Sequence, residues 1–499
     1  MVSTAMALLV LGCSEKTGSE SAVVDSSAFV SETSEPVETG VDTTDSDTQP
    51  ADETGDSDTE PVETGDTGLP WSLAIPTGGC GAPAYDWVPL DDMGRIVDKE
   101  QDLIYSLGAA EIDALMQAFG LGDFTPVANG VEIWRVRYIT QDRGEAIEAS
   151  GIISFPDVPE PKDVPLLLYA HPTMGFTDEC APSAGSIEGL AGAVVFGAQG
   201  MAVATPDYLG MNGFGDPAGF LHPYIAPEPT AVASLDSVRA TLRLADDLGV
   251  NARPDPNMAL FWGASEGGFA ALWAARYAEA GYAPELTIAG VVAAVPPLDV
   301  MGLAQHGATT LGDTTWGTAA ALVTQNPWYG EPAPITDAIT DDKPHFLAST
   351  LPEEMASSCS GYGDPGTIHS TTEVFSKTVH SAFSSGDFDA AGPFGCYTRL
   401  ATLTDPTVGS WSTAPTLVVL AEDDELVVTP PQRDDITTLC DLGMTIEYHE
   451  CAGTDHVSGA VDSTLMQWDW LQDRVAGLPL KVETCVVHEP EQCEGLPGF

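Results

Sequence analysis

Short, nearly continuous apolar runs alternate with helical patterns along the chain, and this alternation constrains the fold more than any other feature of the sequence. Runs of this length without polar positions are typical of strands that are covered on both faces. Helical patterns at residues 231–248 and 267–281 lie between several of the runs, so we predict a mainly parallel sheet flanked by helices and joined by right-handed crossovers. The apolar runs lie at residues 164–170, 201–205, 258–262, 286–292 and 416–420.

Two earlier segments, at residues 131–140 and 147–155, alternate apolar and polar residues instead. Such alternation favours antiparallel strands, which we expect at the start of the same sheet. In parallel α/β sheets the functional side chains lie beyond the carboxyl ends of the strands. We therefore expect the chemistry of this chain at that edge.

The motif Gly263-Ala264-Ser265-Glu266-Gly267-Gly268 lies between the run at residues 258–262 and the helical pattern that follows it. A serine in a strained strand-to-helix turn, with small residues two positions to either side, is typical of a nucleophile elbow. The flanking strand and helix are the context that this motif requires. We therefore predict Ser265 as a nucleophile, with an ordinary turn serine as the alternative.

A serine hydroxyl needs a base to take its proton, and that base is usually a histidine oriented by a carboxylate. In this kind of fold the chain order is serine, acid, histidine. Asp423 and Asp424 follow the run at residues 416–420, and His456 follows a predicted strand at residues 445–449. We favour Asp424 over Asp423, with a solvated acidic turn as the alternative for both.

We favour His456 over His449 as the base, because His449 lies within the predicted strand. The other histidines lie outside the expected order, and we assign them structural or surface roles. They are His171, His222, His306, His345, His369, His380 and His488.

Further motifs occur in order along the chain. They are the strand and turn at residues 166–175, the tetrad Cys180-Ala181-Pro182-Ser183, and the segments at residues 207–211, 222–224 and 235–240. Together with the Ser265 motif they resemble the secretory lipase family of α/β-hydrolases, from about residue 131 to residue 470. The resemblance implies an α/β-hydrolase fold and a lipase or carboxylesterase.

The resemblance also implies an oxyanion hole, formed by the amide of Glu266 and by an amide of the first turn, for which we favour Thr173. Pro172 departs from the family, which usually has glycine there, and it has no amide proton to donate. The amides of Thr173 and Met174 remain available. We interpret His171 in this turn as a hydrogen-bonding scaffold rather than a second base.

The segment at residues 301–396 matches the family poorly and interrupts the predicted hydrolase core, which comprises residues 71–300 and 397–499. We expect it to form a cap over the active site. Five of its aromatic residues either line an acyl pocket or form the cap's own small core, and the sequence leaves both open. They are Trp316, Trp328, Tyr329, Phe375 and Phe383.

Residues 1–13 are short and apolar and end in a cysteine, so they resemble a bacterial lipoprotein signal. We expect membrane attachment through a lipidated Cys13; the alternative is a frayed N-terminus with a buried cysteine. Residues 14–70 are rich in acidic, Thr, Ser, Gly and Pro residues. Such a composition cannot bury enough apolar surface to order itself, so we expect a disordered acidic linker.

Apart from Cys13 the chain has eight cysteines without metal-ligand spacing, which predicts disulfides and an extracytoplasmic, secreted or cell-envelope location. Cys485 and Cys493 are close enough in sequence to staple a C-terminal loop. Cys440 and Cys451 are not expected to pair, because a predicted strand separates them. The remaining cysteines are Cys80, Cys180, Cys359 and Cys396.

The formal net charge of −58, from 17 basic and 75 acidic residues, argues against nucleic-acid binding. We expect neither a cofactor nor a catalytic metal. The function that we predict is hydrolysis of a small-molecule or lipid ester through an acyl-enzyme on Ser265, with His456 as base and Asp424 as its orienting acid. The alternatives are a serine peptidase or amidase on the same fold and a catalytically silent surface binding protein.

Overall fold

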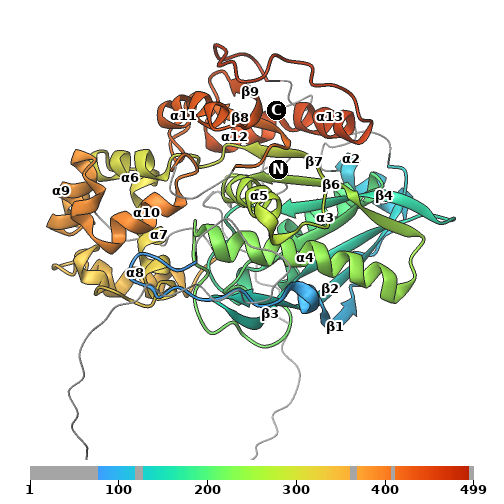
Figure 1. Cartoon of the computed structure of the whole chain (residues 1–499), viewed down its shortest axis with the longest axis horizontal. Helices are drawn as coiled ribbons and strands as arrows, with labels where there is room; N and C mark the ends of the chain where they lie inside the picture. The colour runs from blue at the N-terminus through green and yellow to red at the C-terminus, as the bar shows by residue number, and fades with distance from the viewer. Residues whose placement is uncertain (1–76, 119–126, 360–367, 406–410, 494–499) are drawn as a thin grey trace, which may run out of the picture. The chain divides into compact units, whose positions relative to one another are not determined.

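The computed structural model describes residues 77–118, 127–359, 368–405 and 411–493 (Figure 1). The expected signal segment with Cys13 and the expected linker at residues 14–70 lie outside the described residues. Within the described ranges, no helix is both long enough and apolar enough to cross a bilayer.

A nine-stranded sheet forms the centre of the fold, in the order β1-β2-β3-β5-β4-β6-β7-β8-β9. Strands β1, β2, β3 and β5 pair antiparallel, whereas every pairing from β5 through β4 to β9 is parallel. This architecture confirms the predicted α/β-hydrolase class and the antiparallel opening. The strands are β1 (Ile96–Gln101), β2 (Gly130–Asp142), β3 (Glu145–Asp157), β4 (Lys162–Ala170), β5 (Ala202–Pro206), β6 (Ala252–Ala264), β7 (Ile288–Ala294), β8 (Pro415–Ala421) and β9 (Thr445–Cys451).

Helices cover both faces of the parallel part of the sheet. Because side chains of a strand alternate between faces, Leu166 and Leu168 pack in one hydrophobic cluster and Leu167 and Tyr169 in another. The first cluster includes residues of α4, α5 and α11, and the second includes residues of α2, α3, α12 and α13. The helices are α2 (Ala109–Ala118), α3 (Ile187–Ala198), α4 (Pro227–Leu248), α5 (Glu266–Tyr277), α11 (Thr429–Asp441), α12 (His456–Asp462) and α13 (Thr464–Val475).

A helical insertion separates β7 from β8, and its yellow and orange helices gather at one side of the sheet (Figure 1). The segment predicted as a cap, residues 301–396, lies wholly within the part of the sequence between these two strands. The five aromatic residues named above for the predicted segment belong to or pack against the large hydrophobic cluster that also contains residues of α4 and α5. The inserted helices are α6 (Val300–Thr309), α7 (Asp313–Trp328), α8 (Leu347–Met355), α9 (Lys377–Ser385) and α10 (Pro393–Ala401).

Two disulfides join this insertion to the rest of the chain. Cys80 bonds Cys396 of α10, and Cys180, in the loop after β4, bonds Cys359 of the insertion. The closures span 316 and 179 residues of sequence. Each bond therefore ties inserted helices to a distant part of the hydrolase core.

The other two disulfides hold the C-terminal tail against β9. Cys485 bonds Cys440 and Cys493 bonds Cys451, so the predicted pairing of Cys485 with Cys493 is wrong, while Cys440 and Cys451 do not pair with each other, as expected. The tail runs beside β9: the amide of Cys485 donates to Ile446, and that of Glu491 donates to Glu450. This path carries the two tail cysteines to opposite ends of the strand.

Removing the Cys180–Cys359 bond is predicted to destabilise the protein, because a long closure restricts the unfolded chain more than the folded one. We expect the variant Cys180→Ala/Cys359→Ala to lose about 2–5 kcal/mol of unfolding free energy in urea titrations. The closure of Cys440 with Cys485 spans only 45 residues and offers a matched comparison, with a smaller expected loss on substitution to alanine. A loss below about 0.5 kcal/mol for the first variant would contradict the prediction.

Candidate active site

Ser265 lies in a sharp turn between the end of β6 and the start of α5. Its backbone has φ 56° and ψ −124°, a conformation that non-glycine residues rarely adopt. A Cβ atom on Gly267 would lie 2.1 Å from the carbonyl oxygen of Ala170, and one on Gly263 would lie 2.1 Å from that of Gly267. Glycine at both positions therefore lets the turn pack directly against the end of β4, as the nucleophile-elbow prediction requires.

Hydrogen bonds connect the Ser265 hydroxyl with His456 and Asp424. The Ser265 Oγ lies 2.9 Å from His456 Nε2, and His456 Nδ1 lies 2.8 Å from Asp424 Oδ2. An ionised carboxylate only accepts hydrogen bonds, so Nδ1 carries a proton and Nε2 accepts the hydroxyl proton. All three side chains are buried. The arrangement can remove a proton from the hydroxyl and hold it on the imidazole.

The geometry distinguishes the two candidate acids. Asp424 is buried, and its Oδ1 accepts from the amides of Leu426 and Val427 at 3.0 and 2.7 Å, which aims Oδ2 at His456. Asp423 is exposed and takes part through its backbone, since its amide donates to the Thr454 carbonyl. The structure thus brings Asp424, and not Asp423, into contact with the histidine.

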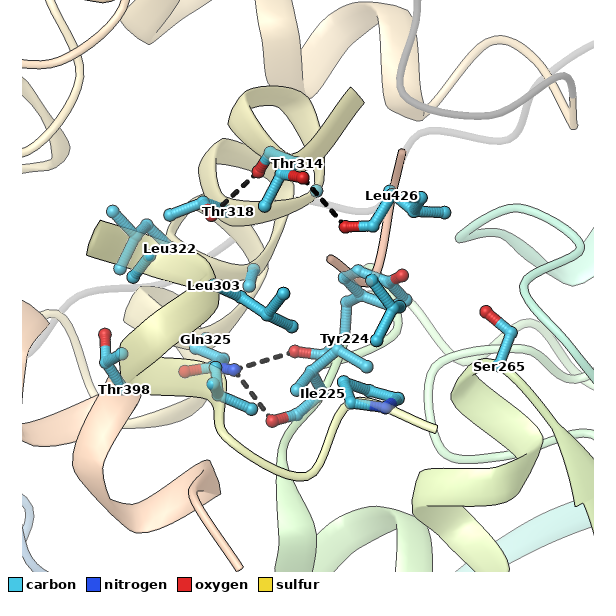
Figure 2. Close-up of a pocket in the computed structure, with 16 residues that line it drawn as sticks. Tyr224, Ile225, Ser265, Leu303, Thr314, Thr318, Leu322, Gln325, Thr398 and Leu426 are labelled. Carbon is cyan, nitrogen blue, oxygen red and sulfur yellow. Dashed lines mark hydrogen bonds between the residues drawn. The ribbon is translucent and has the colours of Figure 1, made fainter. Parts of the chain in front are cut away.

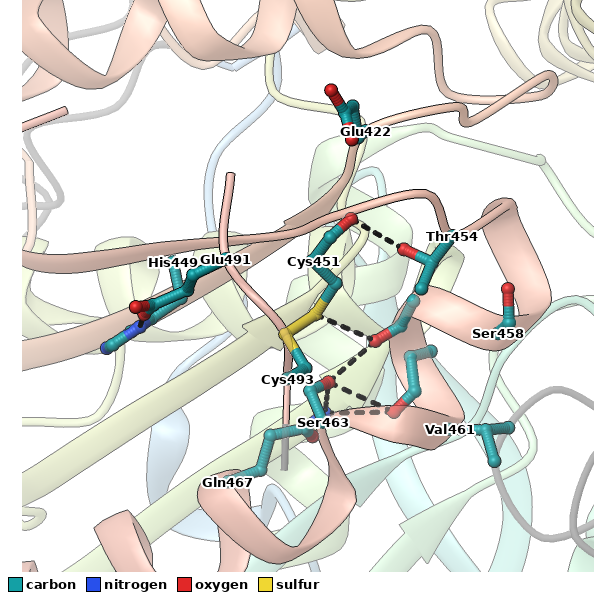
Figure 3. Close-up of a disulfide and its surroundings, with 12 residues drawn as sticks. Glu422, His449, Cys451, Thr454, Ser458, Val461, Ser463, Gln467, Glu491 and Cys493 are labelled. Atoms are coloured by element: carbon teal, nitrogen blue, oxygen red, sulfur yellow. Dashed lines mark hydrogen bonds and ion pairs between the residues drawn. A yellow bond between two sulfur atoms is a disulfide. The ribbon is translucent and has the colours of Figure 1, made fainter. Parts of the chain in front are cut away.

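His449, the second candidate base, contacts the C-terminal tail, whereas the histidine that contacts Ser265 is His456. The His449 Nδ1 contacts Glu491 Oε1 of the C-terminal tail at 2.8 Å, at the strand position that the sequence predicted (Figure 3). The loop after β9 instead delivers His456 as the first residue of α12.

Two features hold that loop. Cys451, the last residue of β9, bonds Cys493, and its carbonyl accepts from the Thr454 hydroxyl at 2.9 Å (Figure 3). Asp455 caps α12 by accepting from the Ser458 amide at 2.8 Å. His456 is therefore placed by a covalent bond on one side and a helix cap on the other.

The pKa of His456 is raised above its usual value. Burial by itself lowers this pKa, but the charge and hydrogen bond of Asp424 outweigh that effect, with Glu425 and Asp455 adding to it. The imidazole is consequently a stronger base than a free histidine, and it becomes protonated at a higher pH.

The two amides predicted to form an oxyanion hole lie on adjoining segments. The Glu266 amide is at the first position of α5, where helical amides have no acceptor within the helix. Thr173 lies in the turn that follows β4. The carbonyl of His171, in the same turn, lies close to Gly267 of α5. Neither amide has a hydrogen-bond acceptor within the part of the chain that the structure describes.

His171 is buried beside this turn. Its Nδ1 donates to the Pro172 carbonyl at 2.7 Å, and burial lowers the pKa of His171 to about 4. The ring is therefore neutral at neutral pH and braces the turn, in keeping with the predicted scaffold role.

Sequence reasoning missed one contact of this region. His222, assigned a structural or surface role, is fully buried, and its Nε2 lies 2.7 Å from Oε1 of Glu266. The motif at residues 222–224 is visible in the sequence, but Glu266, which His222 contacts, lies 44 residues further along the chain. No local pattern connects the two residues.

A cavity of about 50 Å³ opens beside Ser265 (Figure 2). Its walls come from α6, α7, the segment at residues 224–225 and the loop at residues 426–427, and none of the five predicted pocket aromatics lines it. Within the described ranges, no cluster of three or more His, Cys, Asp or Glu side chains is arranged to bind a metal ion.

Comparison with known proteins adds a family and a fold. The family model described as "Secretory lipase" matches residues 193–482, and no curated protein matches the chain. The structure is similar to the rice cell wall degrading esterase LipA from Xanthomonas oryzae, with a TM-score of 0.59, 18% identity, and coverage of 77% of this chain and 97% of that one. It is also similar to lipase A from Candida antarctica, with a TM-score of 0.57, 15% identity, and coverage of 84% and 88%.

The His456–Asp424 contact predicts how the imidazole titrates. We expect histidine NMR to give His456 a pKa above the usual value of about 6.5. The Asp424→Asn variant should have a lower His456 pKa, because it removes the charge that favours the imidazolium and leaves the burial. Asp423→Asn is the matched control and should change the pKa little. The reverse order of the two effects would contradict the assignment of Asp424.

Proposed function

The chain belongs to the secretory lipase family and is a carboxylic ester hydrolase, and we propose that its reaction proceeds through an acyl-enzyme on Ser265. The observation that carries this proposal is the unbroken hydrogen-bonded path from the Ser265 hydroxyl through both nitrogens of His456 to Asp424. The strained turn of Ser265, above the carboxyl edge of the sheet, supports it as well.

In the proposed acylation step Ser265 Oγ attacks the ester carbonyl carbon while its proton moves to His456 Nε2. The carbonyl oxygen becomes an oxyanion, and the amides of Glu266 and Thr173 donate to it. Collapse of this intermediate breaks the bond to the alcohol, which leaves with the proton from His456. Water then attacks the acyl-enzyme with the same base and releases the acid.

The inserted helices act as a cap in this proposal. Supporting it, α6 and α7 supply most of the wall of the cavity beside Ser265, and disulfides tie the insertion to the core at two points. The cap thereby selects esters by the length of the acyl chain that fits in the cavity beside Ser265.

The family and the four disulfides agree with a secreted or extracytoplasmic protein. Attachment to a membrane through Cys13 is a proposal that rests on the residues around that cysteine.

The proposed roles predict the kinetics of two pairs of variants. Ser265→Ala and His456→Ala should each lower kcat on p-nitrophenyl butyrate by at least about a thousandfold, because they remove the nucleophile or its base. Asp423→Asn and His449→Ala are controls and should stay within threefold of wild type.

A fluorophosphonate probe should label the wild type and not Ser265→Ala. Matched peptide anilides test the amidase alternative, since the same side chains attack either carbonyl. Full activity in Ser265→Ala would contradict the acyl-enzyme, and faster cleavage of the anilides would favour an amidase.

The size of the cavity predicts the length of the acyl chain. At about 50 Å³ it is well below the roughly 150 Å³ of a cavity that accepts benzene. Acetyl to butyryl esters should therefore have at least about tenfold higher kcat/KM than dodecanoyl or hexadecanoyl esters.

Leu322 of α7 lines the cavity, so Leu322→Ala should shift the preference toward longer chains. Val323→Ala, one position along and outside the cavity wall, is the control and should keep the wild-type profile. A wild-type preference for dodecanoyl esters would contradict this assignment.

A further inference from the structure

The segment at residues 222–225 contacts both halves of the proposed oxyanion hole. Its first residue, His222, binds the side chain of Glu266, and its third, Tyr224, binds the hydroxyl of Thr173. We infer that His222 and Tyr224 are positioning residues that set the spacing of the Glu266 and Thr173 amides. This inference rests on the proposed function, and we refer to residues 222–225 as the oxyanion clamp.

The His222–Glu266 contact is buried and holds a proton. His222 Nδ1 must donate to the Leu209 carbonyl, 2.8 Å away, because a carbonyl oxygen only accepts. Its Nε2 faces Glu266 Oε1 at 2.7 Å, so one proton lies between them whichever atom carries it. An unpartnered carboxylate at this depth would be costly, and the histidine removes that cost.

This contact restrains the residue whose amide is the proposed donor. Glu266 follows the strained Ser265 and begins α5, so its backbone has no preceding helical turn to hold it. The His222 ring holds the carboxylate at the end of the Glu266 side chain. The positive end of the α5 dipole also favours a carboxylate in this first turn of the helix. The side chain therefore holds the orientation of its own amide.

The Thr173 half of the proposed oxyanion hole is held by aromatic packing and by hydrogen bonds of hydroxyl groups. Tyr208 packs between His171 and His222, with ring centroids at 4.1 and 5.4 Å, and its hydroxyl donates to the His171 carbonyl at 2.9 Å. The Thr173 hydroxyl donates to the Tyr224 hydroxyl at 3.2 Å. The turn after β4 is thus attached to the same clamp as Glu266.

The clamp itself is anchored to α7 of the insertion. Gln325 donates to the carbonyls of Tyr224 and Ile225 at 2.8 and 3.0 Å (Figure 2). The Tyr224 amide donates to the Thr324 hydroxyl at 3.1 Å. Ile225 has φ 53°, which is strained for a β-branched residue and persists only where the surroundings hold it. The helix that walls the acyl cavity therefore also positions the donors.

The test compares variants that remove or keep each contact. Glu266→Leu removes the contact to His222 and should lower kcat by about a hundredfold, with KM within threefold, because the misplaced amide matters only when the oxyanion forms. Glu266→Gln should recover at least tenfold of this loss, because its side-chain amide has the same shape and can keep a hydrogen bond to His222 Nε2. Tyr224→Phe removes one hydroxyl and should lower kcat by about tenfold.

A trifluoromethyl ketone measures the hole directly, because attack by Ser265 turns its carbonyl oxygen into an oxyanion. Its inhibition constant should rise across the clamp variants in proportion to the fall in kcat/KM. Val238→Ala, a truncation in the buried core of α4, is the stability control and should lower Tm without changing kcat per folded enzyme.

Two outcomes separate failure of the clamp from failure of the proposed function. An unchanged kcat in Glu266→Leu and Tyr224→Phe, or a fall that only matches the loss of folded protein, would overturn the clamp while Ser265 remains the nucleophile. Activity that survives in Ser265→Ala would overturn the acyl-enzyme itself, whatever the clamp variants do.

Discussion

The direct packing of backbone against backbone at the turn of Ser265 is the constraint on which the rest of the site depends. Gly267 lies against the carbonyls of Ala170 and His171, which leaves no room for a side chain. This contact brings the start of α5 beside the turn after β4 and places the two proposed oxyanion donors on adjoining segments. It also raises the serine hydroxyl to the edge where the loop after β9 delivers His456.

Buried carboxylates near the site have hydrogen-bond partners that offset the cost of their burial. Asp424 accepts from two amides and from His456, and Glu266 contacts His222. Burial raises the pKa of Asp207, which precedes Tyr208 in the chain, to about 6, and hydrogen bonds from Ser150 and Ser183 oppose that rise. Carboxylates that would be costly if left alone thus become fixed points that orient neighbouring groups.

The helical insertion between β7 and β8 contacts the core both at the cavity beside Ser265 and through disulfides. Helix α7 lines the cavity beside Ser265 and also anchors the oxyanion clamp through Gln325. The bond from Cys180 to Cys359 connects the loop after β4 to the same insertion. In the proposed mechanism, substrate selection and oxyanion stabilisation therefore share one set of contacts between the insertion and the core.

The sequence alone was enough to predict the parallel sheet, its antiparallel opening and the turn of Ser265, because strand periodicity and small-residue spacing are local signals. It favoured Asp424 over Asp423 as the candidate acid and His456 over His449 as the candidate base, with each alternative left open. Only the tertiary structure distinguished Asp424 by its contact, paired Cys485 with Cys440, and brought His222 to Glu266. These contacts join residues far apart in the chain, and their partners are selected by how the segments pack, which no local pattern records.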